Sequence, residues 1–332
     1  MTELSIKHKD IRTLVEKDQV QDFICLVKDK TFGSGKNGKN FLTVLLSDKT
    51  GQIDSKIWDN VDILSSIFAV GDLVKVKGVV QVYNQRKQLV IHRLENVTGQ
   101  ENLKTEDYII SHTLPDSKDL FIQLLSYIEK IENQHIRQLC LDCVKDETIT
   151  QKILKAPAAK SIHHAFQGGL LTHVLSIFRM MESVAQQYTF LNKDFLFFGA
   201  LFHDLGKIEE LDFDSNGRIY YTESGQLLGH MLLSCELIEK KAQKILGFPD
   251  ELKILLKHIV LSHHGKLEYG SPKLPMFPEA IVVAMIDDFD SKMDQVFQFV
   301  QQERQTGERW SRFNEHFERY FYLDNLKEKW QK

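Results

Sequence analysis

The hydrophobic residues of this chain change their spacing once, near residue 100, and that change limits the folds available to it. Between about residues 20 and 98, apolar and polar positions alternate in short runs such as "GDLVKVKGVVQVY", which is typical of strands. From about residue 120 onward, apolar residues recur every three or four positions, as in "GGLLTHVLSIFRMMESV", which is typical of amphipathic helices. The sequence therefore predicts an α+β protein in which a β domain precedes a helical one.

The strand-like part is short and rich in glycine, so its strands are expected to close into a small barrel. About five strand-like runs occur there, and Gly78 inside one of them predicts a bulge. We predict a barrel domain with an N-terminal extension over residues 1–98 and a polar linker over residues 99–119. An all-α domain with leading helices follows over residues 120–302, and an amphipathic helix over residues 303–332.

The composition excludes several classes of protein. No stretch approaches the roughly 18 uninterrupted apolar residues that a membrane span needs. The N-terminus is charged throughout and lacks the apolar middle of a signal peptide. Four cysteines in 332 residues do not make a disulfide framework. We therefore expect a cytoplasmic protein without a membrane partner.

Charge is distributed unevenly along the chain. The net charge is −4, but residues 1–100 carry 15 Lys and Arg against 12 Asp and Glu, whereas the remainder carries 27 against 34. The barrel part is thus mildly basic, which is compatible with a polyanionic partner.

The helical part contains an unusual series of histidines and carboxylates within apolar runs. His173 lies on the same helical face as Leu170 and Ile177, and "LFHDLGK" places a histidine and an aspartate side by side at the end of an apolar run. The complete series is His173, His203, Asp204, His230, His263, His264 and Asp287. Each residue alone is more often a satisfied core residue, but burial without a partner is costly, and shared metal ions explain the whole series with one cause.

Imidazole and carboxylate ligands without thiolate suit Mn²⁺, Fe²⁺, Mg²⁺ or Zn²⁺ better than a structural cysteine site. Adjacent helical residues point about 100° apart, so His203 and Asp204 could serve different ions or different edges of one. We predict one or two divalent ions per chain, with Mn²⁺ as the first choice. Gly206 is expected to end the helix and leave Asp204 at an accessible end.

The order H…HD…H…H…D resembles the HD superfamily of metal-dependent phosphohydrolases over roughly residues 160–295. The resemblance implies an all-helical fold and these metal ligands: His173, His203, Asp204 and Asp287, with His230 and His263 as the additional histidines of two-metal members. It implies a catalytic part for Asp204 between the ions and for Lys207 beside the phosphate. His264 is either an alternative ligand or a phosphate contact.

A second comparison separates subfamilies. Cyclic-dinucleotide phosphodiesterases of this superfamily carry Gly-Tyr-Pro soon after the paired histidines, whereas this chain has Gly270-Ser271-Pro272. The segments "SIHHAFQGGLLTH", "LFHDLGK", "LSHHG", "YGSPKLPMFPEA" and "IDDFDSKM" instead resemble the YhaM-type 3′–5′ exoribonucleases, which join an N-terminal OB-fold to an HD domain. This resemblance covers nearly the whole chain. It implies hydrolysis of single-stranded RNA, and by extension of single-stranded DNA, to 5′-mononucleotides.

The barrel offers candidates for binding that strand, because single-strand binders combine basic grooves with aromatic stacking platforms. The candidates are Phe32, Lys36, Lys39, Phe41, Trp58, Tyr83, Arg86 and Lys87, with His163 and His164 beside the first ligand helix. The alternative for Phe41 and Trp58 is a place in the barrel core. The sequence leaves open which aromatic side chains face outward.

Two other functions remain open at this point. One is an HD phosphohydrolase of nucleotides or small phosphodiesters with a regulatory barrel, and the other is a non-catalytic RNA-binding protein with structural ions. The aromatic residues of the C-terminal segment could pack on the helical domain or form a subunit contact, so a homo-oligomer is also an expectation.

Overall fold

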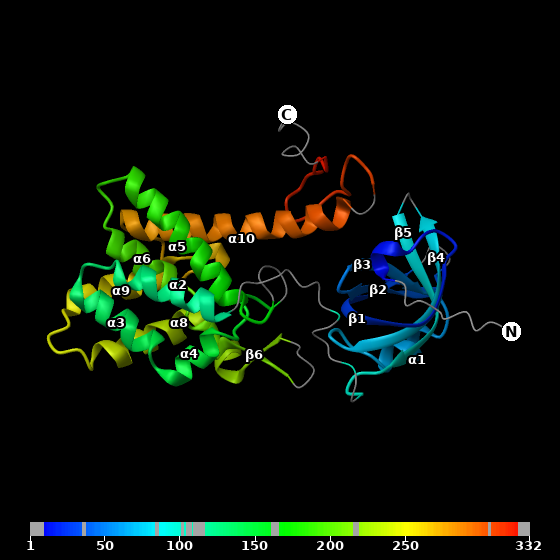
Figure 1. Cartoon of the computed structure of the whole chain (residues 1–332), viewed down its shortest axis with the longest axis horizontal. Coiled ribbons are helices and arrows are strands. Elements are labelled where there is room, and N and C mark those ends of the chain that lie inside the picture. The colour runs from blue at the N-terminus through cyan, green and yellow to red at the C-terminus, as the bar shows by residue number, and fades with distance from the viewer. Residues whose placement is uncertain are drawn as a thin grey trace. The chain divides into compact units, whose positions relative to one another are not determined.

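The structure is a computed structural model that describes residues 10–34, 38–83, 86–100, 103, 108, 117–160, 166–214, 219–304 and 307–324. The chain divides into two compact units. The first comprises Met1–Thr113, Asp214–Arg218 and Phe297–Lys332, and the second comprises Leu114–Phe213 and Ile219–Val296. Figure 1 labels their elements and confirms the α+β prediction, since a barrel lies in the first unit and a helical domain forms the second.

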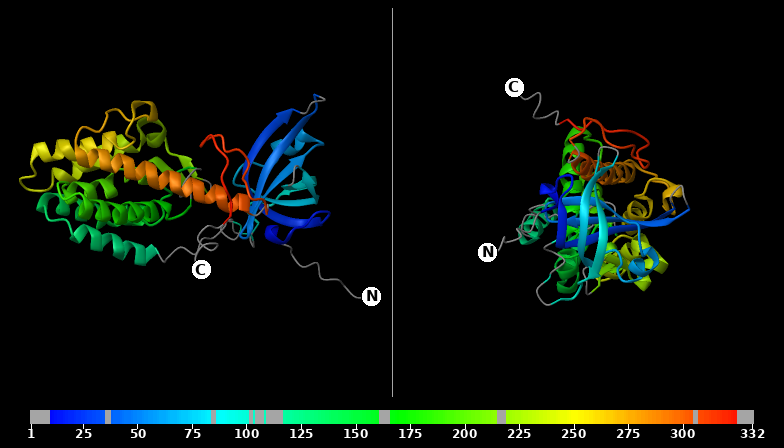
Figure 2. Two further views of the ribbon diagram at one scale, coloured as in Figure 1. Left: turned by 90° about the horizontal axis from the view of Figure 1, so that it is seen from above. Right: turned by 90° about the vertical axis from the view of Figure 1, so that its right-hand side faces the viewer.

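The first unit contains a closed barrel with the strand order β1-β2-β3-β5-β4, seen from two further directions in Figure 2. Its elements are β1 (Gln19–Ser34), β2 (Asn40–Asp48), β3 (Gly51–Ile57), α1 (Val61–Ser66), β4 (Leu73–Tyr83) and β5 (Arg86–Asn96). The long strand β1 closes the barrel, because its first part pairs with β4 and its second part with β2. Register shifts within β1 supply the bends that closure requires.

The glycine predicted to mark a bulge does so. The register between β4 and β5 shifts between Lys77 and Gly78, and a Cβ atom on Gly78 would lie 2.3 Å from the carbonyl oxygen of Val90. The strands therefore approach each other at a point where only glycine fits. The short helix α1 was not predicted, since its six residues are too few to show a helical period.

The helical domain is built around α6 (Lys193–Phe202), which is buried on nearly all sides. The remaining helices are α2 (Ser117–Glu129), α3 (Gln134–Val144), α4 (Glu147–Ile153), α5 (Gly169–Gln187), α7 (Lys207–Glu210), α8 (Glu223–Ala242), α9 (Asp250–Ser262) and α10 (Pro278–Arg304). The Asn192 side chain accepts hydrogen bonds from the first backbone N–H groups of α6 and so fixes its start. A small hairpin of β6 (Leu211–Phe213) and β7 (Ile219–Tyr221) interrupts the predicted all-α pattern.

The predicted C-terminal helix over residues 303–332 is wrong in its described part. Helix α10 ends at Arg304, Gly307 has a φ of 77°, and residues 307–324 form a bridged loop in which Trp310 pairs with Tyr322. The two rings lie 5.2 Å apart. Aromatic residues at three- and four-residue spacing can pack against one another across a turn as well as along a helix. In this segment they pack across the turn. The segment also belongs to the barrel's unit rather than the helical domain's.

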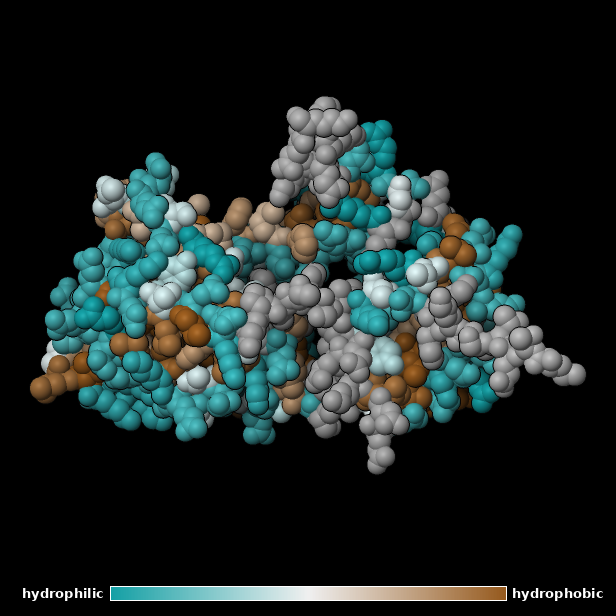
Figure 3. Space-filling view, in the orientation of Figure 1, coloured by the Kyte–Doolittle hydropathy of each residue, from teal (hydrophilic) through white to brown (hydrophobic). Residues whose placement is uncertain are grey.

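One apolar stripe lies on the surface of the helical domain. Figure 3 shows tan and brown side chains along α10, where Ile281, Met285, Phe289 and Met293 are all exposed at intervals of four residues. The opposite face of α10 packs into the core through residues such as Val283. No helix within the described ranges is long and apolar enough to cross a membrane.

Candidate metal centre and nucleic-acid surface

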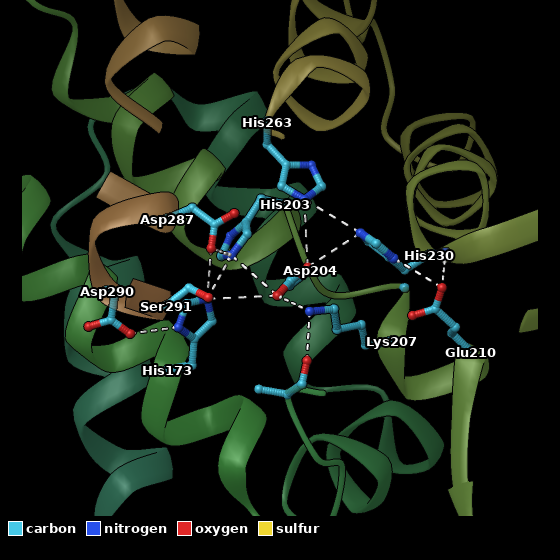
Figure 4. A network of polar contacts seen from close by, with 12 residues as sticks. His173, His203, Asp204, Lys207, Glu210, His230, His263, Asp287, Asp290 and Ser291 are labelled. Atoms are coloured by element: carbon cyan, nitrogen blue, oxygen red, sulfur yellow. Dashed lines mark hydrogen bonds and ion pairs between the residues drawn. The ribbon is translucent and has the colours of Figure 1, made fainter. Parts of the chain in front are cut away.

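Four of the predicted ligands meet in what we call the first cluster: His173 on α5, His203 and Asp204 directly after α6, and Asp287 on α10. The Nε2 atom of His173 lies 3.1 Å from Nε2 of His203 and 3.2 Å from Oδ1 of Asp287. Oδ2 of Asp204 lies 3.6 Å from Nε2 of His203. One atom from each residue therefore faces a common centre, as Figure 4 shows.

Three further histidines form the second cluster: His230 on α8, and His263 and His264 at the end of α9. The Nε2 atoms of His230 and His263 lie 3.4 Å apart. Oδ1 of Asp204 lies 3.5 Å from the first of these atoms and 3.7 Å from the second. Asp204 thus lies between the clusters and directs one carboxylate oxygen to each (Figure 4).

Both clusters fit divalent metal ions. Oδ1 of Asp204 is buried without a hydrogen-bond partner, which is unusual for a carboxylate oxygen inside a protein. Nδ1 of His203 donates to the carbonyl of Gly199 (2.9 Å), and Nδ1 of His263 donates to that of Val260 (2.7 Å). In the neutral rings the Nε2 lone pairs are therefore the ones directed into the clusters. Converging lone pairs and carboxylate oxygens form a site that can hold a cation, and these donor types suit Mn²⁺, Fe²⁺, Mg²⁺ or Zn²⁺.

Two carboxylates that the sequence analysis missed hold the other edges of the histidine rings. Oδ2 of Asp290 lies 2.7 Å from Nδ1 of His173, and Oε1 of Glu210 lies 3.1 Å from Nδ1 of His230. Asp290 follows Asp287 by three residues on α10, so helical spacing could have indicated it. No spacing rule pointed to Glu210. Such outer carboxylates fix the tautomer and orientation of ligand histidines.

Lys207 is tied to the shared ligand. Its Nζ lies 2.7 Å from Oδ2 of Asp204 and donates to the carbonyl of Ala158 at 2.6 Å. Burial lowers the pKa of Lys207, but Asp204 outweighs it and the net shift is upward. Burial raises the pKa of Asp204, but Lys207 and the neighbouring histidines hold it well below its usual range. The pair therefore stays charged inside the domain.

The surroundings of the ligand histidines shift their pKa values in different directions. Burial lowers the pKa of His203, and it lowers that of His263 well below its usual range. Burial also lowers the pKa of His173, but Asp287 and Asp290 outweigh it and raise the pKa to about 9. The carboxylates are thus concentrated around His173, which is where a bound cation gains most from them.

Gly206 was predicted to end the helix and to leave Asp204 at an accessible end. Helix α6 already ends at Phe202, Gly206 has a φ of −61° and directly precedes α7, and Asp204 is buried, so this prediction is wrong. A Cβ atom on Gly206 would lie 2.1 Å from the carbonyl oxygen of His230 and 2.8 Å from the backbone nitrogen of Ser234. The glycine is needed because α8 crosses the turn that carries Asp204, and this close approach brings the two clusters together.

On the barrel, the outer face of β2 and β3 brings two predicted aromatic residues together with one lysine that was not predicted. The rings of Phe41 and Trp58 lie 5.0 Å apart. Nζ of Lys56 lies 4.3 Å from the centre of the Phe41 ring. Phe41 lies beside Gly33 of β1, where any side chain would collide with its ring. We call Phe41, Lys56 and Trp58 the outer patch.

The other barrel candidates do not join this patch. Phe32 is exposed, but it pairs with Leu42 and so belongs to the opposite face of the β1–β2 ribbon. Lys39, Tyr83 and Lys87 are exposed, and Arg86 forms a 2.6 Å ion pair with Glu303. Lys36, His163 and His164 lie outside the described residues.

The fold and these clusters define a metal-binding HD-type helical domain joined to an OB-type barrel. Residues 170–292 match the HD domain family, and residues 26–97 match the family described as "OB-fold nucleic acid binding domain". The chain is 34% identical over 308 residues to the 3′-5′ exoribonuclease YhaM of Bacillus subtilis (strain 168), with 93% of each chain covered. It is 36% identical over 306 residues to YhaM of Halalkalibacterium halodurans, with 91% of this chain and 92% of that protein covered. The chain belongs to the YhaM family of 3′-5′ exoribonucleases.

Proposed function

We propose that this protein is a metal-dependent 3′–5′ exoribonuclease that hydrolyses single-stranded RNA to 5′-mononucleotides. The observation that carries the proposal is the position of Asp204, with one carboxylate oxygen directed to each of two metal-binding clusters. The direction of hydrolysis and the RNA substrate follow from the names of the relatives. When bound at these clusters, divalent ions supply Lewis-acid activation of water and neutralise charge on a phosphodiester.

The residues of the chain provide the positioning. Asp204, His173, His203 and Asp287 would hold one ion, and His230, His263 and His264 with the second oxygen of Asp204 would hold another. Lys207 keeps the Asp204 carboxylate ionised and oriented through its 2.7 Å contact. Because that ammonium group is already bonded to Asp204 and Ala158, we assign Lys207 to positioning rather than to direct contact with substrate.

The outer patch of the barrel is our candidate for holding the RNA strand. The exposed ring of Trp58 and the partly buried ring of Phe41 beside a lysine suit stacking of bases and pairing with phosphate, and each stacked base contributes about 1–3 kcal/mol. Strands 2 and 3 are also the face through which OB-folds bind oligonucleotides. Holding the strand so that its end reaches the metal centre would supply much of the rate by positioning.

The decisive experiment uses 5′-labelled single-stranded RNA and Mn²⁺, with parallel reactions containing a chelator or the Asp204→Ala variant. A ladder that shortens from the 3′ end, and is missing from both controls, is the expected result. Intact RNA that still shifts on a native gel would overturn catalysis and favour an RNA-binding protein with structural ions. Intact RNA without a shift would redirect the assay to nucleotides and small phosphodiesters.

Several finer expectations stay predictions. We expect Mn²⁺ as the working metal because the ligands mix imidazole with carboxylate, and we expect single-stranded DNA as a second substrate and the cytoplasm as the compartment.

For a homo-oligomer, we expect a second copy to pack against the exposed stripe on α10. Four half-exposed side chains of about 200 Å² each give roughly 400 Å² per copy, which is half of one side of a standard interface. Sedimentation of the Phe289→Glu variant against wild type tests this contact.

A further inference from the structure

The two clusters differ in the charge they offer a cation. The first cluster contains two carboxylates, from Asp204 and Asp287, and the carboxylate of Asp290 stands directly behind His173. The second cluster contains three imidazoles, and among the described residues its one carboxylate ligand is the remaining oxygen of Asp204. A divalent cation gains more from two adjacent negative charges than from a shared one, so the first cluster is the stronger site.

The clusters also differ in rigidity. His173 lies inside the regular helix α5, and His203 directly follows α6, where Gly199 fixes its ring. His230 instead follows a break in α8, because Gly229 has φ 75° and ψ 158°, far from helical values. His264 is only partly buried, as is Asp287 of the first cluster. The difference in rigidity therefore lies at His230, whose backbone N–H bonds to Glu210 instead of to α8.

One carboxylate oxygen compensates for the break in α8. Oε1 of Glu210 lies 3.0 Å from the backbone nitrogen of His230 and 3.1 Å from Nδ1 of its ring. Because of the kink, the backbone N–H of His230 has no partner within α8. Oε1 of Glu210 accepts this hydrogen bond and orients the ring with the same atom. In the first cluster, Oδ2 of Asp290 lies 2.7 Å from Nδ1 of His173, and its second oxygen accepts a hydrogen bond from Ser176.

The backbone around Glu210 is held just as closely. A Cβ atom on Gly225 would lie 2.2 Å from the carbonyl oxygen of Glu210, so the start of α8 packs directly against that residue. The carbonyl of Glu210 also accepts a hydrogen bond from the backbone of Thr222 at 3.0 Å. Figure 4 shows the Glu210 side chain beside His230, on the far side of that ring from Asp204.

We infer that the two clusters are unequal metal sites that fill in order, the first cluster before the second, and that Glu210 is the positioning residue that sets the affinity of the second. At limiting metal the protein then holds one ion per chain, bound by His173, His203, Asp204 and Asp287. Because imidazole-rich sites favour transition metals and carboxylate-rich sites accept Mg²⁺, Mg²⁺ competes at the first cluster and hardly at the second.

The test is a titration of the metal-free full-length protein with Mn²⁺, followed by calorimetry and by electron paramagnetic resonance, without RNA. For wild type we expect two equivalents, the second at least about 10-fold weaker, with a six-line mononuclear spectrum up to one equivalent and an exchange-coupled spectrum beyond it. Two equal sites, a single site, or coupling from the first addition would overturn the inference. Because no RNA is present, failure of the exonuclease proposal would leave this result unaffected.

Variants separate positioning from general damage. Glu210→Ala should weaken the second equivalent by about 10- to 100-fold and leave the first unchanged, as loss of an outer carboxylate does elsewhere. Glu210→Gln keeps an oxygen that accepts both N–H groups, so it should lose less, and it remains informative where the alanine variant fails to fold. Asp290→Asn is the matched control and should weaken the first equivalent instead. Equal weakening of both equivalents by Glu210→Gln, or none by Glu210→Ala in a folded protein, would overturn the role assigned to Glu210.

Discussion

The helical domain and the barrel place their chemistry in opposite ways. The metal ligands of the helical domain come from α5, α6, α8, α9 and α10, and most of them are buried among apolar side chains. The outer patch of the barrel comes from neighbouring strands and lies on the surface. A buried polar residue must have a partner, whereas an exposed aromatic residue needs none. In the helical domain the functional residues are therefore part of the buried core and constrain its packing. In the barrel they lie on the surface and do not.

The largest effect is expected from replacing one carboxylate of the buried metal centre. Asp287→Asn removes a charged ligand of the first cluster, so we expect RNA hydrolysis to fall by at least about 10³-fold. Asp288→Asn is the matched control, because Asp288 is its chain neighbour but is paired with Lys292 on the surface of α10. Single-turnover hydrolysis measures both, and similar activities for the two variants would remove Asp287 from the metal centre.

The next prediction concerns the surface region. Replacing Phe41 and Trp58 together by alanine should weaken binding of single-stranded RNA by about 5- to 100-fold, because base stacking is lost. Mn²⁺ binding should be unchanged, since neither residue contacts a metal cluster. The control is Phe32→Ala, on the opposite face of the same ribbon, with fluorescence anisotropy of labelled RNA as the measurement. A larger effect from Phe32→Ala would move the binding surface to the other face.

These two regions also differ in how far the sequence predicted them. His173, His203, Asp204, His230, His263 and Asp287 interrupt apolar helical runs, so their spacing and their cost of burial indicated the metal centre. Phe32 and Phe41 looked equivalent because both flank one glycine-rich loop, yet strand register places them on opposite faces. Glu210 was missed because its importance depends on a kink at Gly229, which no local pattern announces. The C-terminal aromatic residues were misassigned because helical spacing and pairing across a turn look alike in sequence.

Two glycines allow a sharper comparison of the regions. Gly206→Ala would place a methyl group 2.1 Å from the carbonyl of His230, and backbone cannot rotate away. We expect a loss of stability of about 1–3 kcal/mol together with weaker binding of the second Mn²⁺. Gly33→Ala would instead collide with the ring of Phe41, which can turn outward, so RNA affinity should fall with little change in melting temperature. Thermal melts and binding titrations of both variants give the contrast, and a large loss of melting temperature in Gly33→Ala would contradict it.

The smallest effect is a pH dependence confined to the helical domain. Asp146 caps α4 by accepting hydrogen bonds from Thr148 and Ile149, and it pairs with the buried amine of Lys241 at 2.8 Å. The hydrogen bond from Lys241 is the main cause that holds the pKa of Asp146 below its ordinary value of 3.8. The folded state therefore binds this proton less readily than the unfolded state, so the stabilisation is complete above that value and is lost as the pH falls through the lowered pKa. Asp146→Asn keeps an N-cap residue but removes the charge that pairs with Lys241, so it should lower stability by up to about 1 kcal/mol at neutral pH and should lose less on acidification than wild type.

The two regions report separately on this acid effect. The sequence contains no tryptophan between Trp58 and Trp310, and both of these residues belong to the first unit. Tryptophan fluorescence therefore follows the barrel's unit, while far-UV circular dichroism follows mainly the helices. Denaturant titrations between pH 6 and pH 3 should show a stability difference between wild type and Asp146→Asn that shrinks with falling pH in the dichroism signal only. The same shrinking difference in the fluorescence signal would mean that the two units unfold as one, and that the acid sensitivity of the α4 cap is transmitted to the barrel.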